Sequence, residues 1–109
     1  MLQWYPHLYV GRQAAKKQGQ LIHEIEEKQP FSGAYILTFP LNEANQLEIV
    51  PVKSLMREVV YDRTPMIIGL AANKREAYDL LDIIVKDTYA ARHDADMKAY
   101  LRSRIGETG

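Results

Sequence analysis

The strongest structural signal in the chain is residues 66–88, which read MIIGLAANKREAYDLLDIIVKDT. Residues 66–71 are apolar at every position, counting the glycine, which is typical of a strand that is covered on both faces. Asn73 then provides a helix N-cap, and Glu76 stands three residues later, as in a capping box. The residues of the buried helix face recur at helical spacing: Ala77, Leu80, Leu81, Ile84, Val85 and Thr88. The segment therefore predicts a central strand that leads into a long amphipathic helix.

Three more strands and a helix are predicted upstream of this segment. Residues 5–10 (YPHLYV) are aromatic and branched and favour a short strand, which Pro6 places at an edge. Residues 12–28 are rich in good helix formers, and a proline at position 30 ends this predicted helix. Residues 34–40 and 47–52 favour two strands joined by turn residues, which predicts a hairpin with a long loop.

Two shorter helices complete the prediction. Ser54 provides a cap for the first. Its expected buried face consists of Leu55, Met56, Val59 and Val60. Residues 94–109 predict a helical tail, along which Met97, Leu101 and Ile105 form an apolar line at four-residue spacing. These apolar side chains must be buried, either against the tail's own domain or against a partner, and the sequence does not distinguish the two alternatives.

These elements predict a single α+β domain over residues 1–109, with residues 94–109 as its helical tail. The order is strand, helix, strand, strand, helix, strand, helix, around one four-stranded mixed or antiparallel sheet. If each helix returns the chain antiparallel to the strand before it, the first two strands run one way and the last two the other. A ferredoxin-like arrangement is the simplest candidate with this order.

The composition excludes several classes of protein. Fourteen basic residues balance fourteen acidic ones, so no long-range attraction draws nucleic acid or an anionic membrane. The chain has no cysteine, which excludes disulfides, thiolate nucleophiles and cysteine-based metal sites. A cysteine-free chain without a signal peptide or a membrane-spanning run is expected to be cytoplasmic.

Two predicted helices begin with basic residues, although the helix dipole favours acidic residues there. The candidate anion-binding residues are Gly11, Arg12, Lys16 and Lys17 at the first of these helices, and Asn73, Lys74 and Arg75 at the second. Free backbone N–H groups near such cations suit a phosphate or a carboxylate. With the strand directions given above, the two turns lie at opposite ends of the sheet and form two separate weak sites. The alternative is that these charges are merely solvated.

No set of catalytic residues, metal ligands or cofactor-binding residues emerges from the motifs. The three serines lie outside any G-x-S-x-G elbow. His23 could share a helix face with Glu26 and Glu27, but other segments would have to complete a metal shell. The remaining histidines have no spacing that demands a site. The sequence thus predicts no catalytic residue, no metal and no cofactor.

A binding or interaction module that self-associates, without enzymatic activity, is the leading functional hypothesis. Trp4 and Tyr9 on the first strand join Met97, Leu101 and Ile105 as candidate interface residues, although the aromatic rings would fill a small core equally well. The alternative is a phosphate- or nucleotide-binding protein or small enzyme that uses the basic helix starts. The expected partners are therefore a second copy of the chain and a small anionic ligand.

Overall fold

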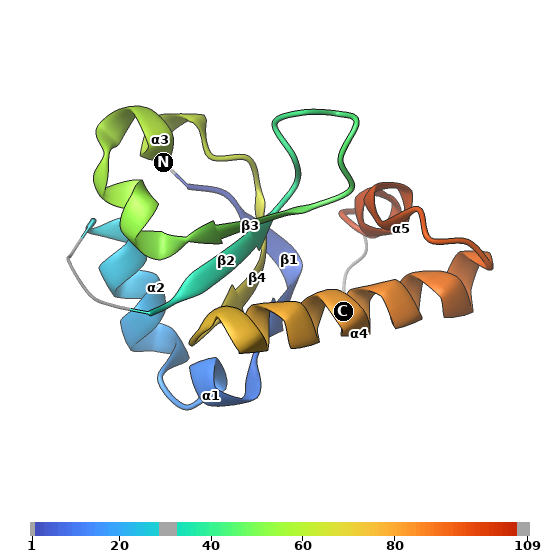
Figure 1. Ribbon diagram of the computed structural model, residues 1–109, viewed down its shortest axis with the longest axis horizontal. Coiled ribbons are helices and arrows are strands. Elements are labelled where there is room, and N and C mark those ends of the chain that lie inside the picture. The colour runs from blue at the N-terminus through green and yellow to red at the C-terminus, as the bar shows by residue number, and fades with distance from the viewer. Residues whose placement is uncertain (1, 29–32, 107–109) are drawn as a thin grey trace.

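The computed structural model describes residues 2–28 and 33–106. Its elements, in chain order, are β1 (Trp4–Val10), α1 (Arg12–Ala15), α2 (Gln18–Glu26), β2 (Tyr35–Thr38), β3 (Glu48–Pro51), the 3-10 helix η1 (Val52–Met56), α3 (Glu58–Arg63), β4 (Ile67–Ala71), α4 (Lys74–Arg92) and α5 (Met97–Ser103). A single four-stranded mixed sheet with helices packed on it confirms the predicted α+β class (Figure 1). None of the described helices is both long and apolar enough to cross a membrane.

The strand order is β1-β4-β2-β3, with β1 parallel to β4 and β2 antiparallel to both of its neighbours. The prediction that the first two strands share one direction is therefore wrong, because β1 and β2 run oppositely. That prediction assumed one helix in each connection, whereas two helices, α1 and α2, connect β1 to β2. The ferredoxin-like candidate depended on the assumed directions, which this sheet does not have.

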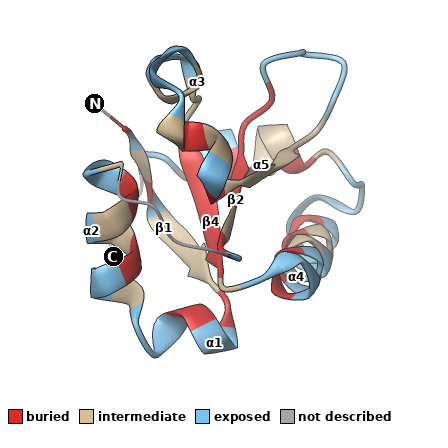
Figure 2. Cartoon of the chain, turned by 60° about the vertical axis from the view of Figure 1, so that its left-hand side comes forward, coloured by how far each residue is buried: buried red, intermediate tan, exposed pale blue. Residues whose placement is uncertain are grey.

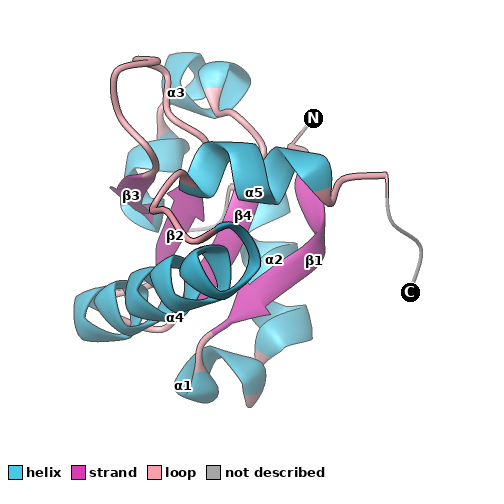
Figure 3. Cartoon of the chain, turned by 90° about the vertical axis from the view of Figure 1, so that its right-hand side faces the viewer, coloured by secondary structure: helices cyan, strands magenta, loops and turns pink. Residues whose placement is uncertain are grey.

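Helices cover both faces of the sheet, so the strands lie in a middle layer (Figures 2 and 3). On one face, side chains of α1, α2, η1 and α3 pack against the sheet, and on the other face those of α4 and α5 do so. Every residue of β4 is buried, which confirms the prediction for residues 67–71. The apolar run is continuous because Ile67 and Leu70 pack into one core, whereas Ile68 and Ala71 pack into the other.

Two predicted helices are divided in the structure. The helix expected over residues 12–28 breaks at Lys17, whose backbone leaves the helical region, and becomes α1 and α2. The expected helical end at Pro30 lies outside the described residues. The short helix predicted to follow a Ser54 cap begins earlier, at Val52, so Ser54 lies within η1 and the predicted cap is wrong. The helix then divides at Arg57, whose backbone is extended. This break leaves Val59 55% exposed, so the prediction that Val59 is buried is wrong.

The C-terminal helix α5 folds back on the domain. Met97 and Leu101 are buried in the core beneath α4 and α5, whereas Ile105 is 38% exposed. The buried Tyr5 hydroxyl donates a 2.7 Å hydrogen bond to the carbonyl oxygen of Leu101, which ties α5 to β1. Of the two alternatives for the predicted tail, the structure shows that the domain itself covers Met97 and Leu101. Residues 107–109 of the predicted tail lie outside the described residues.

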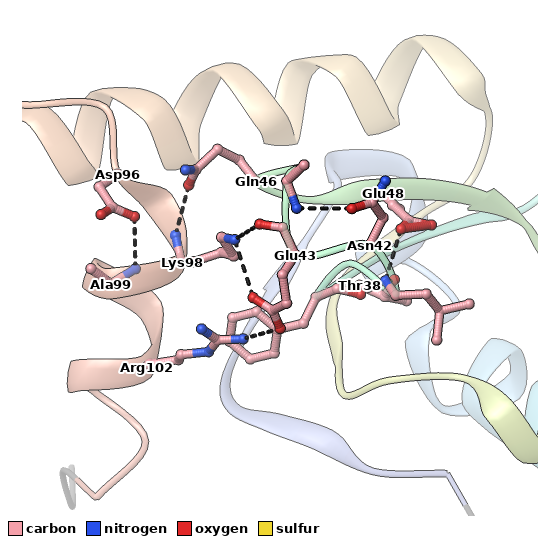
Figure 4. A network of polar contacts seen from close by, with 12 residues as sticks. Thr38, Asn42, Glu43, Gln46, Glu48, Asp96, Lys98, Ala99 and Arg102 are labelled. Atoms are coloured by element: carbon pink, nitrogen blue, oxygen red, sulfur yellow. Dashed lines mark hydrogen bonds and ion pairs between the residues drawn. The ribbon is translucent and has the colours of Figure 1, made fainter.

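Polar side chains of the loop between β2 and β3 also bind α5 (Figure 4). The Glu43 carboxylate accepts hydrogen bonds from Lys98 and, at 3.3 Å, from Arg102. Gln46 accepts one from the Lys98 backbone N–H at 3.1 Å, and Asp96 caps the helix by accepting from the Ala99 N–H. The two cations lower the pKa of the exposed Glu43 carboxyl, chiefly through these hydrogen bonds.

Candidate functional site

The predicted basic turns lie at the same end of the sheet. Because β1 and β4 are adjacent and parallel, the turn after Val10 and the turn after Ala71 are neighbours. The expectation that they lie at opposite ends is therefore wrong. After β1 the chain passes to α1 on one face, and after β4 it passes to α4 on the other. In open sheets with helices on both faces, such a divergence creates a crevice at the carboxyl ends of the strands.

A crevice of about 600 Å³ occupies this position. Its lining residues are Val10, Gly11, Arg12, Gln13, Asn73, Arg75, Glu76, Asp79, Leu80 and Ile83. The volume falls within the range of roughly 300–1,000 Å³ that is typical of small-molecule sites. Apolar side chains of β1 and α4 form part of the wall. The polar part consists of the exposed side chains of Arg12, Gln13, Asn73, Arg75 and Asp79 and the buried side chain of Glu76.

Glu76 joins the two sides of the crevice. It lies in the first turn of α4 and is only 8% exposed. Its carboxylate accepts backbone hydrogen bonds from Gln13 at 2.7 Å, Ala14 at 3.1 Å and Ala72 at 2.9 Å. Two of these donors belong to the start of α1. A charged side chain of the protein itself therefore occupies the position that the sequence suggested for a ligand's anion.

Gly11 makes this approach possible. The residue is buried at the N-cap of α1, and its N–H donates a 2.9 Å hydrogen bond to the Leu70 carbonyl oxygen of β4. A Cβ atom at position 11 would overlap the Glu76 carboxylate. Glycine is thus required here by the close approach of a side chain, because its φ of −65° is open to any residue.

The electrostatic environment keeps Glu76 ionised. Burial raises the pKa of its carboxyl, but the three backbone donors and the nearby Arg12 charge outweigh burial and lower the pKa below 4.5. The Asn73 side chain in turn accepts the Glu76 backbone N–H at 2.9 Å, which confirms the predicted N-cap of α4. The N–H groups of Gln13, Ala14 and Glu76 are therefore already paired and do not await a ligand.

The structure divides the predicted anion-binding residues into two sets. Gly11, Arg12, Asn73 and Arg75 line the crevice, whereas Lys16, Lys17 and Lys74 are exposed outside its lining. The sequence did not identify Gln13, Asp79, Leu80 or Ile83 as site residues. Glu76 was recognised only as part of a capping pattern. No local signal indicated that its side chain would reach a helix more than 60 residues away in sequence.

The crevice offers both charge and apolar surface to a ligand. The Arg12 and Arg75 guanidinium groups can each bind a carboxylate or phosphate through two parallel hydrogen bonds. Asp79 adds an acceptor for a hydroxyl or amino group. Among the described residues, no group of three histidine, aspartate or glutamate side chains is placed to hold a metal ion. The arrangement is thus suited to binding a small organic anion.

The candidate interface residues of β1 have partners within the domain. The Trp4 indole donates a 3.1 Å hydrogen bond to Glu26 of α2, and the Tyr9 hydroxyl donates one of 2.7 Å to Asp87 of α4. Burial, followed by this hydrogen bond and the Asp87 charge, raises the pKa of Tyr9. Both aromatic side chains are half-buried and attach helices on opposite faces to the edge strand.

Comparison with known proteins leaves the chain without an assigned family. No family model matches it, and neither the curated proteins nor the solved structures include a significant match.

Proposed function

We propose that the chain is a binding domain for a small anionic molecule, which it holds in the crevice between α1 and α4. The observation that carries the proposal is the position of the crevice. It opens at the carboxyl ends of two adjacent parallel strands whose connections leave to opposite faces. Ligands of open sheets with helices on both faces bind at such divergence points.

The chemistry of the walls defines the class of ligand. Because Glu76 takes the backbone donors at the start of α1, the ligand's anionic group is bound by side chains, chiefly Arg12 and Arg75. Val10, Leu80 and Ile83 provide an apolar wall for a ring or a short hydrocarbon part. A carboxylate or phosphate attached to such a part therefore fits better than an inorganic anion does.

A thermal-shift screen followed by calorimetry tests the proposal. The probes are inorganic phosphate, nucleoside monophosphates and aromatic and aliphatic carboxylic acids. A ligand at 100 times its dissociation constant stabilises the folded state by about 2.7 kcal/mol. We expect an organic anion to raise the melting temperature and phosphate alone to have little effect.

A matched pair of variants separates specific binding from general charge attraction. The double variant Arg12→Ala, Arg75→Ala removes two cations from the crevice wall. The double variant Lys16→Ala, Lys17→Ala removes two exposed cations that lie close in sequence but outside the lining. Binding lost in the first and kept in the second supports the site. Equal loss in both, or no binding by any probe to the wild type, contradicts it.

A further inference from the structure

A second hollow, of about 240 Å³, lies between the β2–β3 hairpin and α3. Val50 of β3 and Val60 of α3 line it together with Pro65, and Thr38 and Thr64 complete its interior. It shares no lining residue with the crevice between α1 and α4. We refer to it below as the α3 groove.

The α3 groove has an apolar interior. The Thr38 hydroxyl donates to the Phe39 carbonyl oxygen at 2.8 Å, and the Thr64 hydroxyl donates to the Val60 carbonyl oxygen at 2.8 Å. Neither hydroxyl proton is therefore available to an occupant. The α3 groove suits an apolar side chain and offers little to a polar ligand.

Two of the apolar side chains that line the α3 groove are exposed. Leu41 is 64% exposed and Val59 is 55% exposed, and both belong to its lining. The same surface therefore carries a hollow and the kind of side chain that fills one. A surface that contains both can pair with a copy of itself, because in a twofold interface each subunit presents the same patch.

The charged side chains of the α3 groove are complementary to the same side chains on a second copy of the chain. Glu48 and Arg63 line it, and neither forms an ion pair within the described part of the chain. Among the described residues, the Glu48 carboxylate accepts a hydrogen bond only from the Leu41 backbone N–H, at 2.8 Å. A twofold axis through the patch can bring Glu48 of each subunit to Arg63 of the other, which yields two equivalent ion pairs.

We propose that a second copy of the chain docks on the α3 groove in a twofold dimer. Leu41 and Val59 of each subunit enter the hollow of the other, and Glu48 pairs with Arg63 across the interface. The contact is made by side chains rather than by strand pairing. Proline has no backbone N–H, so Pro51 removes a hydrogen-bond donor from the edge strand β3. The dimer is independent of the ligand proposed for the crevice, because the two sites share no residue.

Sedimentation over a concentration range from about 1 to 500 µM tests the dimer, a span that covers the micromolar dissociation constants of weak interfaces. We expect the wild type to dimerise and Val59→Asp to raise the dissociation constant at least about tenfold. Ile105→Asp is the matched control, because Ile105 is an exposed apolar residue outside the α3 groove. A wild type that stays monomeric at the top of this range overturns the proposal. So does a dimer that Ile105→Asp disrupts and Val59→Asp does not.

Charge reversal tests the proposed register. Arg63→Glu alone places two acidic groups in contact across the axis and is expected to weaken the dimer. The double variant Arg63→Glu, Glu48→Arg restores opposite charges and is expected to recover dimerisation. Far-ultraviolet circular dichroism confirms that each variant is folded. A double variant no better than Arg63→Glu alone, in a folded protein, overturns the Glu48–Arg63 pairing.

Discussion

Glu76 acts within this fold as an internal ligand for a helix start. The first N–H groups of a helix have no partner within the helix and need an acceptor from elsewhere. At α1 that acceptor is a carboxylate from α4, which also binds the Ala72 N–H of its own turn. One side chain thereby joins the connections that leave β1 and β4.

Glu76→Gln and Gly11→Ala are expected to destabilise the protein through the same contacts. The amide introduced by Glu76→Gln has one oxygen for three donors and turns its NH₂ toward an N–H, which costs about 1–3 kcal/mol. The methyl group introduced by Gly11→Ala displaces the carboxylate and breaks the same hydrogen bonds. The effects should therefore be strongly non-additive in a double-mutant cycle measured by urea denaturation. Additive effects would mean that Gly11 and Glu76 act separately, and exposed Glu58→Gln serves as the control.

The stability that Glu76 provides is expected to depend on pH. Its pKa in the folded state lies below the ordinary value of 4.5, so the folded protein favours the ionised form. This contribution is fully present above pH 4.5 and is lost as the pH falls from there through the lowered pKa. The difference in unfolding free energy between wild type and Glu76→Gln should shrink over that range. A difference that stays constant down to about pH 3, roughly 1 unit below an ordinary glutamate pKa, would contradict the mechanism.

Among the elements, α4 has one buried and one exposed side. Ala77, Leu80, Ile84 and Thr88 are buried, Leu81 and Val85 are half-buried, and Ile83 is 45% exposed. The stripe matches the one that the sequence predicts, but its centre is shifted toward Leu80 and Ile84. The periodicity indicates which face is buried, whereas the depth of each residue depends on what the sheet and α5 place against it.

Ile84→Ala is expected to cost about 2–5 kcal/mol of unfolding free energy, because the side chain is fully buried and its loss leaves a cavity. Leu81→Ala should cost less, since Leu81 is only half-buried. Ile83→Ala is the exposed neighbour for comparison and should stay within about 0.5 kcal/mol of the wild type. Chemical denaturation measures all three. A loss at Ile83 equal to that at Ile84 would mean that α4 is rotated about its axis.

Across the whole molecule, the sheet couples two cores that lie on its opposite faces. Ile25, Ile36 and Leu55 belong to one core, whereas Leu37 and Leu101 belong to the other. Strands β2 and β4 contribute residues to both. Because both cores depend on the same strands, loss of one core removes support from the sheet on which the other core packs. We therefore expect the domain to unfold cooperatively.

Leu101→Ala tests this coupling across the sheet. Leu101 is fully buried in the core on the α4 side, while Trp4, the one tryptophan in the sequence, packs against the opposite core. The substitution should lower the stability seen by Trp4 fluorescence and by circular dichroism equally, by about 2–5 kcal/mol. A fluorescence transition that stays at the wild-type midpoint would show that the two layers unfold separately.

Features that depend on neighbouring residues could be predicted from the amino-acid order alone. The continuous apolar run of 67–71, the Asn73 cap, the helical period of α4 and the hairpin of β2 and β3 all follow from local spacing and turn chemistry. The α+β class follows from their order. Four of the seven predicted anion-site residues also line the crevice: Gly11, Arg12, Asn73 and Arg75.

How these elements meet depends on the folded chain. The parallel pairing of β1 with β4 brings the turn at Gly11 to the turn at Asn73, and it allows Glu76 to bind an N–H 63 residues away. The break at Arg57 exposes Val59, and the burial of Leu101 depends on where α5 returns to the sheet. The strand pairing and the return of α5 are set by contacts between distant segments, whose free energies leave no periodic trace in the local sequence.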